Sequence, residues 1–350
     1  MNSLSEVFPP EFSADPKSLQ LPTTIDSIVH SQVCHIFRAD GKYVDAVAAR
    51  YFQGVHNWLP IVARRRFLER LAHFQHISNA DFSILLLAMG LITQHPSLDP
   101  STNQDREVFY LATKTMFAKV QAFIPSSLCL VQAGVILSFY EYAHGMIEAA
   151  YVTIGTCARM AAAIGLNNKQ CSVELQGSEA WFDDEEALCT WWGLVICDRY
   201  SWKLHSNLFE LLLTAFRVVS LDPAMHGRPL ATRSIREDDY LPLEAEGLES
   251  GLVSSLEPTF RYFVSATSLP GVGSFGREAQ ATYLLDKVRI AIESGDTSHN
   301  TMYPIGRELQ SLLGTVMDQV AGKTKDFCGA IQMLITYVLN FWSHIPSNLT

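Results

Sequence analysis

The sequence predicts an all-α protein. Apolar residues recur at three- and four-residue spacing along most of the 350 residues, and no segment alternates with period two for long enough to form a strand. Hydrophobic residues make up 48% and charged residues 18% of the chain, an apolar content well above that of disordered proteins. We therefore expect one multi-helix domain of packed antiparallel helices over residues 25–345.

Residues 1–24 are expected to form a flexible N-terminal arm, because prolines interrupt any helix in a segment with little apolar content. The segment lacks the basic and then apolar order of a signal peptide, so we expect an intracellular protein. The longest apolar stretches, residues 84–92 and 187–197, fall well short of the ~20 residues that a membrane-spanning helix needs. We expect no contact with a membrane.

Apolar periodicity predicts helices in the first third of the chain over residues 24–37, 44–52, 63–74, 81–93 and 105–123. Pro60 breaks the chain between the second and third of these helices, and Pro125 follows the end of the fifth. Asp81 precedes a long apolar run, which makes it the expected N-cap of the fourth helix.

The strongest helical pattern lies in the middle of the chain. Ser127 is placed to cap a helix that Gly145 interrupts, and a second helix then runs over residues 146–164. Gly165 followed by Leu166 suits a left-handed C-cap with an apolar contact. The second helix carries small residues on more than one side, so we expect two antiparallel helices of which the second is central and enclosed.

In the C-terminal half, an acidic run at residues 183–186 precedes an apolar helix over residues 187–200. Negative charge is favourable at a helix N-terminus, so we expect a solvated helix start, with an acidic interaction patch as the alternative. Residues 222–258 contain several prolines and are expected to be rich in loops. Further helices are predicted over residues 277–292, 302–322 and 326–342.

A glycine motif, Gly271 to Gly276, matches G-x-G-x-x-G, and Asp296 lies twenty residues after it. A dinucleotide site requires this motif to follow a strand at the start of a βαβ unit, and no strand is predicted here. We therefore expect a loop that leads into a helix and not a cofactor site.

The sequence contains no recognisable catalytic or metal-binding motif. His73 and His76 lie near Glu69 on one helix but have no second ligand pair, so we expect surface histidines. Cys157 and His144 have no third group to complete a nucleophilic site. The cysteines include no CxxC pair and are expected to be buried free thiols: Cys34, Cys129, Cys157, Cys171, Cys189, Cys197 and Cys328. We expect neither enzymatic activity nor a cofactor in this chain.

Charge also limits the function. The formal net charge of -10 disfavours direct binding to nucleic acid. The basic triplet Arg64-Arg65-Arg66 is expected to be a solvated helix face.

Asp198-Arg199 follows an apolar stretch, so we expect a buried structural ion-pair network, with an effector contact as the alternative. The side chains that end the first central helix either line a cavity or pack as an aromatic cluster: Tyr140, Glu141, Tyr142 and His144.

Several segments stand in a distinctive order: YFQGVHNWLPIVARRRF, LVQAGVILSFYEYAHGMIEAAYVTIGTCARMAAAIGL, WWGLVICDRY, GRPLATR and GREAQATYLLDKV. Together they resemble the regulatory middle homology domain of fungal zinc binuclear-cluster transcription factors, over residues 25–340. The motif positions, which we expect to be structural, are Tyr51, Phe52, His56, Pro60, Gln132, Tyr140, Glu141, Gly145, Gly155, Arg159, Gly165, Leu166, Trp191, Trp192, Asp198, Arg199, Gly227, Arg228 and Pro229.

The resemblance implies an all-α regulatory domain of a nuclear transcription factor, of a kind that often controls a secondary-metabolite or catabolic gene cluster. It implies protein partners in the transcription machinery and a homo- or heterodimer with a complete family member. Family members carry an N-terminal six-cysteine cluster that binds two zinc ions, and this chain starts too late to contain it. We expect no DNA binding by this chain, and zinc only if such a cluster precedes it. The rival class is a helical small-molecule-binding protein or an enzyme without a recognisable motif.

A second departure from the family is SWKLHSNLFELLLTAFR, residues 201–217, which has no counterpart in the family pattern. It places an apolar block where a short surface loop is expected. We expect this segment to be an insertion that comes from a translated intron or a misplaced exon boundary. An authentic inserted helix is the alternative.

Overall fold

The structure is a computed structural model that describes residues 22–74, 78–94, 100–168, 179–203, 229–242, 261–296 and 298–320, with Ala330 and Leu334. The α-helices in these residues are α2 (Pro22–Ala39), α3 (Val44–Gln53), α4 (Arg64–Ala72), α5 (Ala80–Ile92), α6 (Pro100–Phe123), α7 (Leu128–Ala143), α8 (Ile147–Ala163), α9 (Glu179–Lys203), α12 (Ser274–Glu293) and α13 (His299–Val320). The described residues form no strand beyond one antiparallel bridge between Tyr240 and Phe263. The all-α prediction is confirmed.

Four predicted features fall wholly or mostly outside the described residues. They are the N-terminal arm at residues 1–24, the segment at residues 201–217, the loop-rich region at residues 222–258, of which only 229–242 are described, and the last predicted helix at residues 326–342. Of the helices that the structure describes, none combines the length and apolarity needed to cross a membrane.

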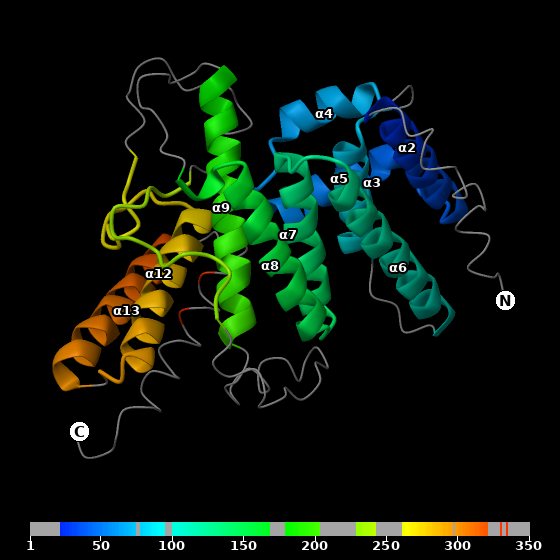
Figure 1. The fold of residues 1–350 in the computed structure, drawn as a ribbon. Helices are drawn as coiled ribbons and strands as arrows, with labels where there is room; N and C mark the ends of the chain where they lie inside the picture. The colour runs from blue at the N-terminus through cyan, green and yellow to red at the C-terminus, as the bar shows by residue number, and fades with distance from the viewer. Residues whose placement is uncertain are drawn as a thin grey trace.

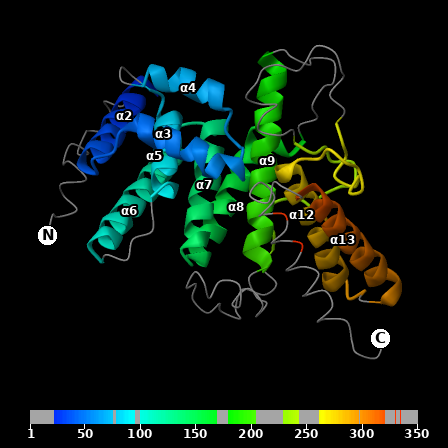
Figure 2. The ribbon, with the colours of Figure 1, turned by 180° about the vertical axis from the view of Figure 1, so that it is seen from behind.

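The helices follow one another across the molecule in chain order (Figure 1). α2 and α3 pack on α5, α5 and α6 pack on α7, and α7 packs on α8 and α9. α12 then packs on α9 and α13 on α12, so the C-terminal helices lie on the opposite side of the molecule from α2 (Figure 2). The core is a series of helix layers with α7 in the middle.

α7 is the enclosed central helix. Its residues from Leu130 to Glu141 are all buried, and it contacts α5, α6, α8 and α9. The prediction that α8 is the enclosed helix is wrong, because Val152, Arg159 and Ala162 on α8 are exposed. The small residues of α8 are compatible with close packing, but only one side of the helix faces neighbours.

The N-cap predicted for α7 and the glycines predicted after α7 and α8 are all confirmed. The Ser127 hydroxyl accepts a hydrogen bond from the Leu130 amide at 3.2 Å and caps α7. Gly145 and Gly165 follow α7 and α8 with φ of 73° and 76°, the left-handed region that glycine adopts without strain. Leu166 is buried behind Gly165, as the C-cap pattern predicts.

The predicted N-cap of α5 is wrong. α5 begins at Ala80, so Asn79 occupies the N-cap position, without a side-chain cap. Asp81 lies inside the first turn, where its carboxylate accepts a hydrogen bond from the Ser127 hydroxyl at 2.8 Å. The carboxylate therefore joins the starts of α5 and α7 instead of capping its own helix.

The glycine motif leads into α12 as predicted. Gly273 occupies the N-cap position of α12, and Gly271 adopts a φ of 83°. The described residues that precede the motif, 261–270, contain turns and the single bridge at Phe263 but no strand. The context of a dinucleotide fingerprint is therefore not present in this part of the chain.

Gly134 marks a close approach of α7 to α6 and α8. A Cβ placed there would lie 2.3 Å from Cys157 Sγ and 2.9 Å from the Phe117 ring. Both neighbours are buried. We therefore expect Gly134→Ala to lower the free energy of unfolding by about 2 kcal/mol through overpacking, although alanine has the better helix propensity. Chemical denaturation of the purified chain measures this change.

Gly314→Ala in α13 is the matched control, because a Cβ there would meet nothing within 4 Å. We expect this substitution to leave the free energy of unfolding unchanged or to raise it by up to ~1 kcal/mol. Equal effects of the two substitutions would contradict the close packing of α7 against α8.

Candidate functional site

The motif positions fall into a buried and an exposed group. The buried positions are Tyr51, Phe52, His56, Pro60, Gln132, Tyr140, Glu141, Leu166, Trp191, Trp192, Asp198 and Arg199. Gly145, Gly165, Arg159 and Pro229 are exposed, and Gly155 faces open space. Gly227 and Arg228 lie outside the described residues. The expectation of a structural role therefore suits the buried positions better than the exposed ones.

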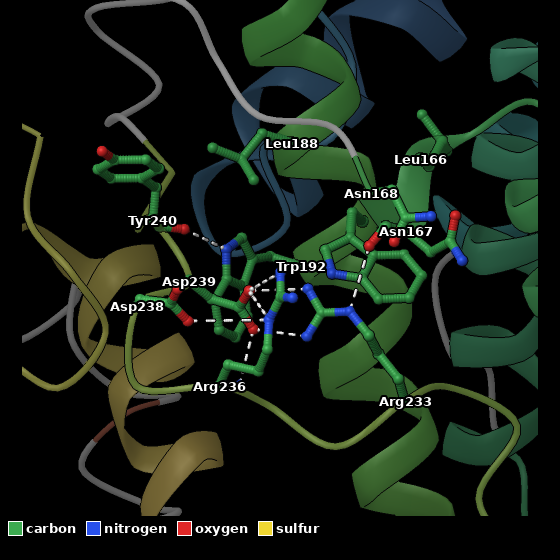
Figure 3. Close-up of a pocket in the computed structure, with 11 residues that line it drawn as sticks. Leu166, Asn167, Asn168, Leu188, Trp192, Arg233, Arg236, Asp238, Asp239 and Tyr240 are labelled. Carbon is green, nitrogen blue, oxygen red and sulfur yellow. Dashed lines mark hydrogen bonds and ion pairs between the residues drawn. The ribbon is translucent and has the colours of Figure 1, made fainter.

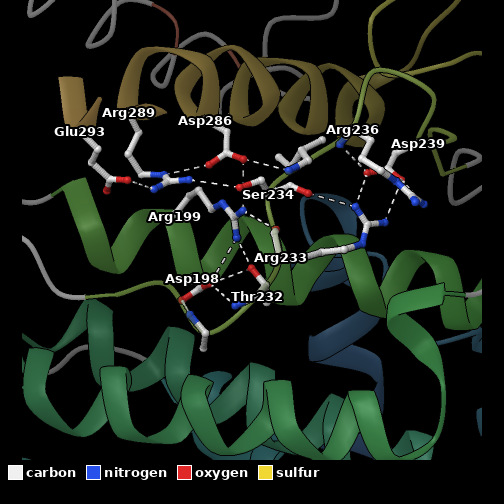
Figure 4. A network of polar contacts seen from close by, with 12 residues as sticks. Asp198, Arg199, Thr232, Arg233, Ser234, Arg236, Asp239, Asp286, Arg289 and Glu293 are labelled. Carbon is white, nitrogen blue, oxygen red and sulfur yellow. Dashed lines mark hydrogen bonds and ion pairs between the residues drawn. The ribbon is translucent and has the colours of Figure 1, made fainter. Parts of the chain in front are cut away.

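A buried ion network joins α9 to α12, and we call it the clamp (Figure 4). Its members are Asp198, Arg199, Thr232, Asp286 and Arg289. The Arg199 side chain is 0% exposed. Its guanidinium donates to Asp198 at 3.2 Å, to Asp286 at 3.4 Å and to the Thr232 hydroxyl. Asp198 and Arg199 are thus buried and paired with each other, as predicted.

The clamp also holds residues 229–242, which we call the strap, between α9 and α12 (Figure 4). Asp198 accepts hydrogen bonds from the Thr232 amide at 2.8 Å and from the Thr232 hydroxyl at 2.7 Å. Asp286 accepts from the Ile235 amide at 2.8 Å and from Arg289 Nε at 3.0 Å. Each buried carboxylate therefore has both a cationic and a backbone partner, which offsets the cost of its desolvation.

A small polar cleft lies beside the clamp, between α9, the strap and the turn after α8 (Figure 3). Its volume of about 40 Å³ is room for roughly three water molecules. Pockets for metabolites and cofactors usually start at ~300 Å³. The cleft can therefore hold ordered water, and it is too small for a metabolite.

Arg233 occupies one wall of this cleft. It donates two hydrogen bonds of 2.7 Å to Asp239 and one of 3.2 Å to the Asn167 carbonyl. Its guanidinium also lies over the Trp191 ring, 5.6 Å from the centroid. Burial alone would raise the pKa of Asp239, but hydrogen bonds from Arg233 and the Arg236 amide outweigh it and hold that pKa below its usual range. The strap is thus tied to the end of α8 as well as to α9.

The side chains at the end of α7 pack as an aromatic cluster, the second of the two predicted alternatives. Tyr140 stacks on His144 with ring centroids 3.9 Å apart and on Tyr110 at 5.7 Å. Burial raises the pKa of Tyr140 to about 12 and lowers the pKa of His144. Both rings are therefore neutral near pH 7 and suited to stacking.

Glu141 beneath these rings is fully buried and accepts from three side chains. Tyr110 donates at 2.9 Å, Lys114 at 2.5 Å and Thr153 at 2.6 Å. Burial and the nearby Glu141 carboxylate raise the pKa of Tyr110. Glu141 therefore connects α7 to α6 and α8, and its role is structural.

A further buried cluster surrounds Glu186, and the sequence did not predict it. Glu186 Oε1 accepts from the Ala63 amide at 3.0 Å and from Gln132 at 3.0 Å. Gln132 also donates to the Ile61 carbonyl at 2.6 Å. The cluster ties the segment before α4 to α7 and α9. Its one sequence signal is the position of Glu186 one turn before Thr190, on the buried side of α9.

The acidic run at residues 183–186 is therefore not a solvated helix start. α9 begins at Glu179, a full turn before the acidic run. The last two residues of the run, Glu185 and Glu186, therefore face the core. Glu185 is 0% exposed and pairs with Arg261 at 2.7 Å. Arg66 pairs with Asp183 and with Glu186. Of the basic triplet predicted to be a solvated helix face, only Arg64 and Arg65 are exposed.

His56 is buried beside Phe52, with ring centroids 5.0 Å apart. Burial, with a smaller contribution from Arg64, lowers the pKa of His56 to about 4. The ring is therefore neutral at physiological pH. Within the described part of the chain, no three His, Cys, Asp or Glu side chains are grouped to hold a metal ion, and His76 lies outside that part.

Known proteins are similar to parts of this sequence. The family model "Fungal specific transcription factor domain" matches residues 48–214. "Transcription factor BOA15" of Botryotinia fuckeliana (strain B05.10) is 31% identical over 144 residues, which cover 41% of this chain and 78% of that protein. The chain belongs to the fungal-specific transcription factor domain family. The resemblance predicted from the sequence is confirmed, and the family is one of transcription factors and not of enzymes.

A second family relative, named "Transcription factor", comes from Aspergillus terreus (strain NIH 2624 / FGSC A1156). It is 25% identical over 298 residues, which cover 76% of this chain and 47% of that protein. No solved structure matches the chain. The family match spans α3 to α9 and reaches into residues 201–217, whose origin as an insertion stays a prediction. The clamp links this matched part to the strap and α12 beyond it.

A substitution in the clamp tests its structural role. Asp198→Ala removes one of the two carboxylates paired with the fully buried Arg199. We expect the free energy of unfolding to fall by about 3 kcal/mol, because a buried charge is left partly unpaired. Chemical denaturation measures the change.

Asp238→Ala is the matched control, since Asp238 lies on the same strap with a side chain 75% exposed and 3.8 Å from Arg236. Its effect is expected to stay within ~0.5 kcal/mol. If the two variants have the same denaturation midpoint, the clamp does not have a structural role.

Proposed function

We propose that this chain is a regulatory domain that acts in the nucleus through contacts with other proteins of the transcription machinery. The observation that carries the proposal is family membership, together with relatives that are named transcription factors. The proposal includes control of a secondary-metabolite or catabolic gene cluster, as the family resemblance implies.

The domain itself does not read DNA sequence in this proposal. Its formal net charge of -10 opposes approach to the phosphate backbone. The basic triplet at the start of α4 is partly used inside the protein, because Arg66 pairs with Asp183 and Glu186. DNA is then reached through a partner, such as a complete family member that carries a zinc cluster.

In the described part of the chain, buried polar side chains tie the helices together. The clamp, the Glu141 cluster and the Glu186 cluster use their polar groups to hold helices together. The cleft beside the clamp has a volume of about 40 Å³, which suits water. This cleft therefore gives no support to small-molecule binding at this place in the fold.

A tethering assay tests the proposed function. The full chain is fused to an unrelated sequence-specific DNA-binding domain and expressed in a fungal cell that carries a matching reporter. We expect reporter expression to change, in either direction, relative to the DNA-binding domain alone at equal protein level. A reporter that does not respond in any host fungus would contradict a regulatory role.

The same purified chain, without the fusion, is tested for binding to duplex DNA at physiological salt. We expect no sequence-selective binding, because the net charge of the chain repels the phosphate backbone. Nanomolar affinity for one DNA sequence over scrambled DNA would contradict the claim that a partner reads the DNA.

A further inference from the structure

Ser234 is an exposed serine of the strap that lies beside the clamp (Figure 4). Its hydroxyl accepts a contact of 3.5 Å from Arg289 Nη2, which is longer than the about 2.7–3.2 Å of an ordinary N–H···O hydrogen bond. Residues 233–236 form neither a helix nor a turn. The hydroxyl is therefore weakly held and accessible to a modifying enzyme.

Three acidic residues follow Ser234 along the strap. Glu237 lies three positions after it and is exposed, and the Asp238 side chain is 75% exposed. Asp239 is used within the protein, because it pairs with Arg233. Kinases select substrates by their charge pattern, and an acid-directed serine kinase binds carboxylates that follow the serine by three or four positions. The strap therefore presents an acceptor hydroxyl and two accessible carboxylates in this spacing.

We propose that Ser234 is a phosphorylation site for an acid-directed serine kinase, and that its phosphate releases the strap from the clamp. ATP is the phosphoryl donor. The Ser234 oxygen forms a bond to the γ-phosphorus, the bond from that phosphorus to the bridging oxygen of ADP breaks, and the hydroxyl proton passes to the catalytic base of the kinase. The inference goes beyond the proposed function and does not depend on it.

Arg289 is the cation that the phosphate meets. Its Nε donates to Asp286 at 3.0 Å and its Nη1 to Glu293 at 2.5 Å, whereas Nη2 has only the long contact with Ser234. Phosphate oxygens extend beyond the hydroxyl oxygen, so they close this gap to the about 2.7–2.9 Å of a charge-assisted hydrogen bond. A phosphate with a charge of about −1.5 to −2 therefore competes with Asp286 for the Arg289 guanidinium.

The charges already present around Arg289 decide the direction of the effect. Two guanidiniums pair there with three carboxylates: Arg199, Arg289, Asp198, Asp286 and Glu293. A phosphate adds negative charge to a group in which carboxylates already outnumber guanidiniums, so like-charge repulsion opposes the closed arrangement. Asp286 also accepts the amide of Ile235, the residue after Ser234. Phosphorylation therefore weakens the attachment of the strap to α12.

Treatment of the full purified chain with an acid-directed serine kinase and ATP tests the acceptor. Tandem mass spectrometry locates the phosphate, and we expect it at Ser234 of the folded protein. A synthetic peptide of residues 230–240 is the positive control for kinase activity. If Ser234 of the protein carries no phosphate under conditions that fully modify the peptide, the proposal is overturned.

Glu237→Gln tests the acidic recognition. Glutamine keeps an oxygen that accepts the hydrogen bond of 3.2 Å from the Tyr283 hydroxyl, so we expect the fold to be unchanged. The rate of phosphorylation at Ser234 should fall roughly tenfold, because a charge that binds the kinase is lost. Asp318→Asn on the exposed side of α13 is the matched control and should leave the rate unchanged. Equal rates in the two variants would contradict recognition by an acid-directed kinase.

Hydrogen exchange tests the release of the strap. We expect the Ile235 amide to exchange roughly tenfold faster in the phosphorylated chain than in the unmodified chain, while the middle of α9 keeps its rate. Ser234→Ala treated with the same kinase is the matched control, because it retains any phosphate placed elsewhere. Its Ile235 amide should exchange at the same rate with and without the kinase.

The proposal is also overturned if a phosphate at Ser234 leaves the exchange of the Ile235 amide unchanged or slows it. These measurements require neither DNA nor a reporter. Their failure is therefore distinct from a failure of the regulatory role, which the tethering assay measures.

Discussion

The buried guanidinium of Arg199 is the constraint on which the C-terminal half of the fold depends. A cation with no exposed surface is tolerated only when carboxylates and carbonyls surround it. Asp198 lies next to it on α9, whereas Asp286 comes from α12 and the Arg233 carbonyl from the strap. The charge is satisfied only when these three segments are together, so α9, the strap and α12 form one structural unit.

The N-terminal half is organised in the same way around carboxylates. Glu186 on α9 accepts from the Ala63 amide before α4, and Glu141 on α7 accepts from Lys114 on α6 and Thr153 on α8. Apolar packing around α7 supplies the core, and these polar groups determine which segments lie next to each other. A domain held in this way presents fixed surfaces, which suits the proposed contacts with other proteins.

The sequence predicted features that depend on neighbours along the chain. The helices follow from apolar spacing, the Ser127 cap from local hydrogen bonding, and the burial of Arg199 from the apolar stretch before it. It did not predict Asp286 as a partner, because that residue lies 87 positions away and only the packing of α12 on α9 brings it near. It missed the buried role of Glu186 because α9 begins a turn earlier than the acidic run.

We expect the clamp to hold the backbone of the strap as firmly as a helix holds its own backbone. Hydrogen exchange followed by mass spectrometry reports this directly at the Thr232 and Ile235 amides, which donate to Asp198 and Asp286. We expect these amides to exchange as slowly as those in the middle of α9, because they open only when the ion network opens. Exchange of the strap at the rate of an open loop, while α9 stays protected, would contradict the claim.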